Sequence, residues 1–139
     1  MGGVARLAKQ LGHTVSGTDA NAYPPMSTQL AALNVQLFEG YSPDNIPDQT
    51  DVVVVGNTIS RGNPELEAAL TRRMRYTSGA QWLSENVLQG RWVLAVAGTH
   101  GKTTTASLLA WILHDNQLNP GYLIGGVPEN FGESARLGS

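Results

Sequence analysis

The spacing of apolar residues along the chain predicts alternating helices and strands. Apolar positions recur every three or four residues in the helical segments, whereas the strand segments are short and rich in β-branched residues. Helices are expected at residues 3–11, 24–33, 63–73, 80–88 and 102–116. Strands are expected at residues 14–19, 35–38, 51–56, 75–77, 92–98 and 122–126. This alternation predicts an α/β fold with parallel, doubly wound sheets.

The clearest strand signal is DVVVVG, at residues 51–56. A continuous run of β-branched apolar residues is typical of a strand buried on both faces of a parallel sheet. Asn63, Pro64 and Glu65 then predict a helix start, with Asn63 as the N-cap and the acid near the positive end of the helix dipole. The tryptophans are expected to pack in cores or at a seam between domains: Trp82, Trp92 and Trp111.

The first expected element is a helix, although a doubly wound domain normally begins with a strand that leads into a glycine turn. QLGHTVSGTD falls where the second strand of such a domain would follow its first helix. Only Met1, Gly2 and Gly3 stand in the place of the turn. We therefore expect the chain to be a piece of a longer protein, with Met1 as an internal methionine.

Composition narrows the classes of protein. Hydrophobic residues make up 41% of the 139 residues and charged residues 14%, which fits a buried α/β protein, and the net charge of −2 gives no sign of nucleic-acid binding. The absence of cysteine excludes disulfides and thiolate metal sites. No apolar run is long enough to span a membrane, and the N-terminus lacks the pattern of a signal peptide. We expect a cytoplasmic protein with neither a nucleic-acid nor a membrane partner.

The stretch WVLAVAGTHGKTTT, at residues 92–105, has a pattern typical of a phosphate-binding loop. GTHGKT, at residues 98–103, follows the pattern G-x-x-G-K-[ST] between an expected strand and an expected helix. A full Walker A loop would need a further glycine where this chain has Val96. The alternative is an ordinary strand-to-helix turn that contains glycine and lysine.

Each residue type in this loop suits a part of a nucleotide. Glycines let backbone N–H groups approach an anion, and the start of the following helix adds unpaired donors. Lys102 would bind β- and γ-phosphate oxygens, and the Thr103 hydroxyl would hold Mg²⁺. His100 could contact nucleotide or face solvent, and Thr104 is a further candidate contact. The candidate ATP-binding residues are Gly98, Thr99, His100, Gly101, Lys102, Thr103 and Thr104.

Other candidates follow expected strands, where ligands of parallel α/β sheets bind. Asp19 ends a strand and would meet a ribose or base; a turn-forming role is the alternative. The loop GNTISRGNP lies after the strand at 51–56, where a diphosphate could be bound, although it would also serve as a polar loop before a capped helix. Its candidate residues are Asn57, Thr58, Ser60 and Arg61.

GTHGKTTT, preceded by RWVLAVA, resembles the ATP loop of the Mur ligase family of peptidoglycan synthesis. The family's loop has this shortened G-x-x-G-K-T form, which accounts for Val96. The resemblance covers essentially the whole chain, in the successive blocks GTDANAYPPMSTQL, DVVVVGNTISRGNPELEAAL, SGAQWLSENVLQGRWVLAVAGTHGKTTTA and GYLIGGVPENFGESARLGS.

The resemblance implies a Rossmann-like domain that binds UDP-N-acetylmuramate over residues 1–90, and the beginning of a P-loop ATPase-type α/β domain over residues 91–139. The whole enzyme would use ATP and Mg²⁺ to join UDP-N-acetylmuramate to a murein tripeptide through an acyl phosphate. YPPMST and GNTISRGNP favour the tripeptide over L-alanine, the amino substrate of a near relative within the family.

The resemblance also implies roles for single residues. Lys102 and Thr103 would carry catalysis, with Thr103 on the metal. Asp19, Asn57 and Ser60 would lie toward UDP, and Arg136, in SARLG, toward the muramic acid.

Two elements of the family pattern are expected to lie beyond Ser139: an acidic strand that helps to hold Mg²⁺, and a third domain. The chain by itself is therefore expected to bind nucleotide weakly and not to ligate. The alternative is a stand-alone, non-catalytic nucleotide-binding module. A small P-loop kinase is disfavoured because the loop follows a full α/β unit.

Overall fold

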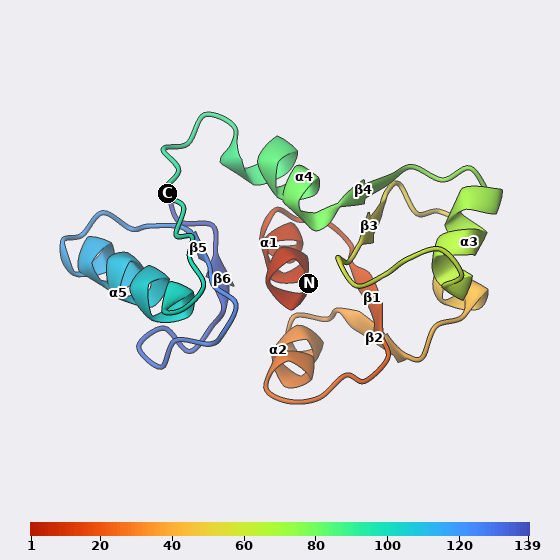
Figure 1. Ribbon diagram of the computed structural model, residues 1–139, viewed down its shortest axis with the longest axis horizontal. Coiled ribbons are helices and arrows are strands. Elements are labelled where there is room, and N and C mark those ends of the chain that lie inside the picture. Colours follow the sequence, from red (N-terminus) through yellow and green to blue (C-terminus); the bar gives the residue numbers. More distant parts are fainter.

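Helices and strands alternate along residues 1–83 in the computed structural model, which describes all residues from Met1 to Ser139 (Figure 1). The elements of this part are α1 (Gly2–Gln10), β1 (Ser16–Asp19), α2 (Met26–Ala32), β2 (Gln36–Glu39), β3 (Val53–Val55), α3 (Pro64–Thr71), β4 (Tyr76–Ser78) and α4 (Gly79–Leu83). A 3₁₀ turn at Pro43–Asn45 precedes β3, and a π-helical turn at Ser84–Leu88 continues α4. The rest of the chain contains α5 (Lys102–Asp115), β5 (Tyr122–Leu123) and β6 (Ala135–Arg136).

Four of the strands form two parallel pairs. β1 pairs with β2, from Ser16 opposite Gln36 to Asp19 opposite Glu39, and β3 pairs with β4, from Val53 opposite Tyr76. A helix lies between the two strands of each pair in sequence, as a parallel connection requires. The predicted α/β fold with parallel strands is thus confirmed.

The third pair, β5 with β6, is antiparallel, which differs from the parallel sheets that we predicted. No helix separates these two strands in sequence. A parallel connection needs a crossover of about a dozen residues or more, usually a helix, so the short connection at residues 124–134 favours the antiparallel direction.

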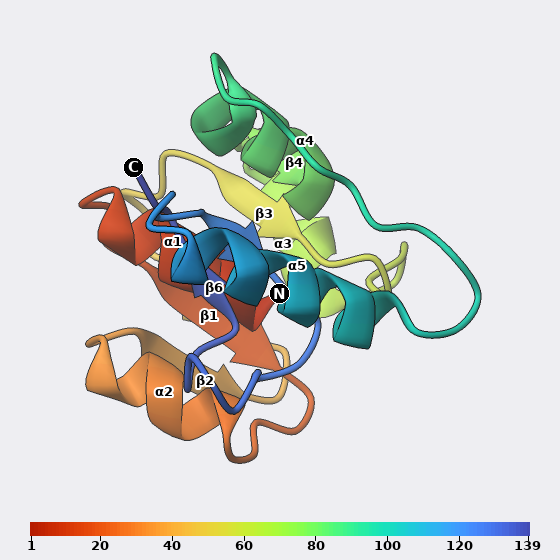
Figure 2. The same ribbon diagram turned by 90° about the vertical axis from the view of Figure 1, so that its left-hand side faces the viewer.

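Residues 92–98 were predicted to form a strand, and that prediction is wrong for this structure. No strand pairs with the segment, and without a partner its backbone groups cannot form a ladder. Its apolar side chains are correspondingly open to solvent: Trp92 is 93% exposed, Val93 49% and Leu94 55%. The long connection into α5 is conspicuous in Figure 2.

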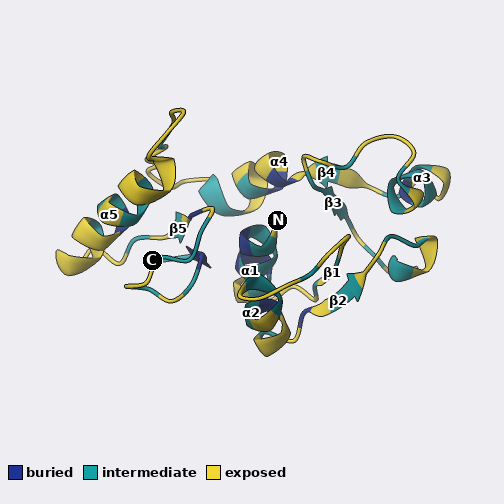
Figure 3. Ribbon diagram, turned by 60° about the horizontal axis from the view of Figure 1, so that its bottom comes forward, coloured by how far each residue is buried: buried dark blue, intermediate teal, exposed yellow.

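The core lies around α1. Leu7, Ala8, Trp82 and Ala135 are buried together, so that α1 contacts both α4 and β6. Figure 3 shows α1 in the middle of the molecule, with α5 on one side and α3 on the other. This packing joins the C-terminal segment of the chain to the parallel-strand unit.

Two burial predictions need correction. The strand at 51–56 was expected to be buried on both faces, but the three residues of β3 are only half-buried, although Val52 and Val54 pack against the core around α1. Of the tryptophans, Trp82 is buried as predicted, whereas Trp92 and Trp111 are exposed. Trp92 lies in the unpaired segment, and Trp111 lies on α5, where its ring is 5.6 Å from that of Phe131 between centroids.

The predicted helix cap at Asn63 is confirmed. Its side-chain oxygen accepts hydrogen bonds from the backbone N–H groups of Glu65 at 3.0 Å and Leu66 at 3.2 Å. These two donors have no partner within the helix, and the cap satisfies both.

Replacing Asn63 with alanine is expected to lower the free energy of unfolding by about 1 kcal/mol, because both donors lose their acceptor. Urea unfolding followed by tryptophan fluorescence measures the change. Asn63→Asp retains an acceptor oxygen and should keep most of the stability; an equal loss in both variants would contradict a capping role.

Candidate functional site

The glycine-rich loop turns directly into α5. Gly101 is the residue before the helix and adopts a left-handed conformation, with φ of 75°, which favours glycine. The Lys102 ammonium group folds back over the loop and donates to the Gly98 carbonyl oxygen at 2.7 Å and the Thr99 carbonyl oxygen at 3.4 Å. The amine therefore already lies against the loop.

The backbone of the loop has free donors. The N–H groups of residues 98–104 donate no hydrogen bond to any group of the chain. The unpaired segment before the loop also has backbone N–H groups without an acceptor. In Lys102, Thr103 and Thr104, however, the free N–H groups follow from the position of these residues in the first turn of α5. These donors and the Lys102 ammonium suit an anion with several oxygens.

Thr103 lies beside the loop that follows β5. Its methyl carbon is 3.4 Å from the position that a Cβ on Gly126 would take, an ordinary van der Waals distance, so the two residues are direct neighbours. The Thr103 hydroxyl makes no hydrogen bond within the chain, whereas its carbonyl accepts one from Ser107 at 2.7 Å. An unpartnered hydroxyl at this place fits the expected Mg²⁺ ligand.

The other predicted loop residues face solvent. His100 and Thr104 are exposed, and the His100 Nδ1 lies 3.2 Å from the Thr99 hydroxyl oxygen. These contacts are local, and the expected nucleotide roles of the three residues stay predictions.

Asp19 adopts the turn geometry that we named as its alternative role. Its side-chain oxygen accepts a hydrogen bond from the Asn21 N–H at 3.2 Å, and its carbonyl oxygen accepts one from the Gly40 N–H at 2.9 Å. The carboxylate still stands at the end of β1, where a ribose or base was expected. Its binding role stays a prediction.

The loop after β3 divides into two parts. Asn57 lines an open pocket of about 400 Å³ together with residues of β4 and α4, whereas Thr58, Ser60 and Arg61 do not line it. Arg61 instead forms a two-pronged ion pair with Glu67, at 2.7 Å and 3.2 Å. Arg61 is therefore engaged by Glu67 of α3, and Asn57 is the one candidate residue of this loop that lines the pocket.

Glu67 also accepts a hydrogen bond from the Gly62 N–H at 2.9 Å. Hydrogen bonds from Arg61 and Gly62 hold the pKa of Glu67 below its ordinary value, and the same pairing raises the pKa of Arg61. Both side chains are exposed, so the pair orders the loop more than it stabilises the fold.

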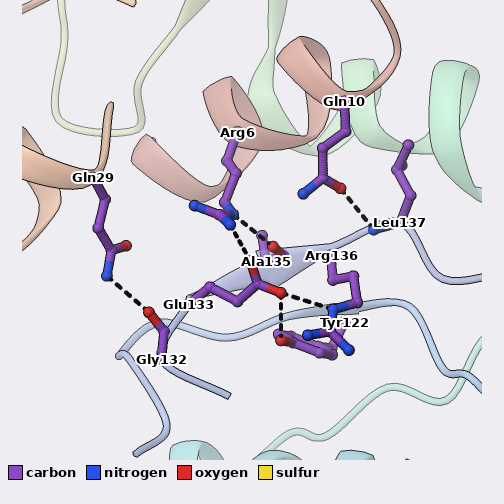
Figure 4. Close-up of polar contacts among 9 residues, drawn as sticks. All are labelled: Arg6, Gln10, Gln29, Tyr122, Gly132, Glu133, Ala135, Arg136 and Leu137. Carbon is purple, nitrogen blue, oxygen red and sulfur yellow. Dashed lines mark hydrogen bonds and ion pairs between the residues drawn. The ribbon is translucent and has the colours of Figure 1, made fainter. Parts of the chain in front are cut away.

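Arg136 lies in a polar cluster that sequence reasoning did not find (Figure 4). Its Nε donates to Glu133 at 2.7 Å, and Glu133 also accepts hydrogen bonds from Tyr122 at 3.2 Å and from Arg6 of α1. Arg6 and Glu133 are 127 positions apart, and no local pattern marks them as partners.

Burial by itself would raise the pKa of Glu133, but the hydrogen bond from Arg136 and the charges of Arg6 and Arg136 together lower it below its ordinary value. Burial and the nearby carboxylate raise the pKa of Tyr122 to about 12. At neutral pH the cluster therefore contains an ionised carboxylate, a neutral phenol and two guanidinium groups.

The candidate residues form separate groups. α3, which follows the Asn57 loop, and α5, which follows the Lys102 loop, lie on opposite sides of α1 (Figure 1). No cluster of three or more histidine or acidic side chains able to hold a metal ion is present. None of the helices has the length and apolar character needed to cross a membrane.

Comparisons with known proteins give consistent similarities. A model of the Mur ligase family, catalytic domain, matches residues 1–91. The chain is 56% identical over 138 residues to the UDP-N-acetylmuramate--L-alanyl-gamma-D-glutamyl-meso-2,6-diaminoheptandioate ligase of Escherichia coli, covering 99% of this chain and 30% of that protein. It is 38% identical over 138 residues to a UDP-N-acetylmuramate--L-alanine ligase of Allorhizobium ampelinum, covering 99% of this chain and 29% of that protein.

Among solved structures, the chain resembles UDP-N-acetylmuramate:L-alanyl-gamma-D-glutamyl-meso-diaminopimelate ligase from Neisseria meningitides. The TM-score is 0.93 and the identity 59%, over 99% of this chain and 43% of that one. The chain thus spans about 30% of the length of the curated relatives that it matches.

Proposed function

Because this chain belongs to the Mur ligase family, we propose that it is a segment of an ATP-dependent ligase that joins UDP-N-acetylmuramate to L-alanyl-γ-D-glutamyl-meso-diaminopimelate. One observation carries the choice of substrate. The identity is 56% to a ligase named for this tripeptide and 38% to a ligase named for L-alanine, over the same 138 residues.

We assign residues 1–90 to a domain that binds UDP-N-acetylmuramate and residues 91–139 to the beginning of an ATP-binding domain. Both parallel strand pairs fall in the first part, and the glycine-rich loop and α5 fall in the second. Asp19, Asn57 and Arg136 are the candidate contacts of the sugar nucleotide. ATP as the phosphoryl donor is consistent with a cytoplasmic enzyme.

The main chemical role proposed for this chain is to neutralise the negative charge of the phosphate groups. Transfer of the γ-phosphoryl group to the lactyl carboxylate of UDP-N-acetylmuramate gives ADP and an acyl phosphate; the peptide amine then attacks the carbonyl carbon, loses a proton and displaces phosphate. When nucleotide binds, the Lys102 ammonium would give up its hydrogen bonds to the carbonyl oxygens of Gly98 and Thr99 and donate to phosphate oxygens instead. Mg²⁺, held in part by Thr103, would supply further neutralisation of the phosphates.

The 139 residues alone are proposed to bind nucleotide weakly and not to ligate. The Lys102 loop is open to solvent, and the candidate sugar-nucleotide loop at Asn57 lies on the other side of α1. An active site that excludes water would need further protein to cover the ATP loop.

The amino substrate is tested by phosphate release from the full-length ligase that contains this chain. With ATP, Mg²⁺ and UDP-N-acetylmuramate present, the tripeptide is expected to support turnover and L-alanine to support at most a few per cent of that rate. L-alanine as the better substrate would show that the enzyme belongs with the alanine ligases. Absence of turnover with either amine would favour a non-catalytic nucleotide-binding module.

A further inference from the structure

The Glu133 carboxylate contacts three other side chains. Its Oε1 accepts hydrogen bonds from the Arg136 Nε at 2.7 Å and the Tyr122 hydroxyl at 3.2 Å, and its Oε2 is paired with the Arg6 Nη2. The side chain is only 15% exposed, so these contacts replace water as its source of hydrogen bonds. Figure 4 shows Glu133 between the two arginines, one on either side of its carboxylate.

Arg136 is held on one side and free on the other. Its guanidinium carbon lies 5.6 Å from the centre of the Tyr122 ring and 5.5 Å from that of Phe131, and its Nε is the only side-chain nitrogen bonded to the chain. The rings and Glu133 together fix the plane of the group. The two terminal nitrogens remain as a paired set of donors, which matches a carboxylate or phosphate.

Arg6 connects this arrangement to α1. Its Nε donates to the Ala135 carbonyl oxygen at 3.0 Å while its Nη2 pairs with Glu133. Gln10 on the same helix accepts from the Leu137 N–H at 2.9 Å. The placement of α1 against β6 therefore determines where the Glu133 carboxylate stands.

The charges of the cluster favour an anionic ligand. Arg6 and Arg136 contribute two positive charges and Glu133 one negative charge, which leaves a net positive charge beside the free nitrogens of Arg136. Glu133 thus orients Arg136 without cancelling the attraction for an anion.

We propose that Glu133 is a positioning residue for substrate: it directs the terminal nitrogens of Arg136 toward an anionic group of the sugar nucleotide, and Arg6 fixes Glu133 from α1. This inference rests on the proposed function. It also means that sugar-nucleotide binding depends on the contact between α1 and β6.

The test uses steady-state kinetics of the full-length ligase with Glu133→Gln. Without the negative charge Arg136 is free to turn, so the KM for UDP-N-acetylmuramate is expected to rise about tenfold, while kcat and the KM for ATP change less than twofold. Glu129→Gln is the matched control, since Glu129 is an exposed acid of the same segment with no polar contact. It should behave as the wild type.

A double-mutant cycle separates positioning from a general structural role. Arg136→Ala alone should raise the KM for UDP-N-acetylmuramate, and adding Glu133→Gln should raise it no further, because Glu133 acts through Arg136. If Glu133→Gln does not fold, Arg136→Lys replaces it: lysine keeps the charge but lacks the paired nitrogens, and the same tenfold rise is expected.

The proposal is overturned by an unchanged KM in folded Glu133→Gln or Arg136→Lys. It is also overturned by a rise that is equal for ATP and sugar nucleotide, or by effects of Glu133 and Arg136 that simply add. Absence of UDP-N-acetylmuramate-dependent turnover in the wild type is a different failure, because it removes the proposed function and this inference with it.

Discussion

Replacing Lys102 with alanine in the full-length ligase is expected to lower kcat by at least about 100-fold. The loop offers one ammonium group to the phosphates, and removing a single donor that stabilises charge in a transition state costs about 10²- to 10³-fold in rate. The KM for UDP-N-acetylmuramate should stay near its wild-type value, since Lys102 lies in the ATP loop and not in the proposed sugar-nucleotide domain. Phosphate release at saturating ATP measures the effect.

Two variants serve as controls for this result. Lys9, in α1, is the only other lysine of the chain, and its side chain makes no hydrogen bond or ion pair, so Lys9→Ala should leave kcat unchanged. Lys102→Arg keeps the charge but presents a larger, planar group, and it should recover little activity. Normal turnover by Lys102→Ala would show that the loop has no role in catalysis.

The second large effect concerns stability. Glu133→Ala leaves Arg6 and Arg136 facing each other with no carboxylate between them, and loss of one partner of a largely buried ion pair costs about 3 kcal/mol. Urea unfolding at pH 7 measures this loss. Glu129→Ala removes the same charge from an exposed position and should change the free energy of unfolding by less than about 0.5 kcal/mol.

The contribution of Glu133 should depend on pH in a defined direction. Its pKa in the folded protein lies below the ordinary value of 4.5, so the folded state favours the ionised form. The stabilisation is then fully present above about pH 4.5 and is lost as the pH falls through the lowered pKa of the folded state. The difference between wild type and Glu133→Ala should therefore shrink in acid; a difference that grows below pH 4.5 would contradict the ion-pair explanation.

Local signals in the sequence predicted local structure well. The Asn63 cap, the parallel strand pairs and the turn of Gly101 into α5 each depend on neighbouring residues or on regular spacing. The prediction of a strand at residues 92–98 was wrong for a related reason. Apolar spacing indicates that a segment can form a strand, but a strand also needs a hydrogen-bonded neighbour, which the spacing does not reveal.

Contacts between distant residues could not be predicted in this way. Arg6 looked like an ordinary helix residue and Glu133 like an ordinary loop residue, and only the packing of α1 against β6 brings them together. Of the candidate site residues, Lys102 and Thr103 could be chosen because a motif specifies their chemistry. The roles of Asp19, Asn57 and Arg136 depend on ligand geometry, and the roles of all five residues stay predictions.

The central claim is that this chain is part of a ligase that activates a carboxylate with ATP. It is tested most directly with UDP-N-acetylmuramate labelled with ¹⁸O in the lactyl carboxylate, in a single turnover of the full-length enzyme with ATP and the tripeptide. Mass spectrometry of the released phosphate should find one carboxylate ¹⁸O per phosphate, because the acyl phosphate breaks between carbonyl carbon and oxygen. Amide product formed with unlabelled phosphate would contradict the claim.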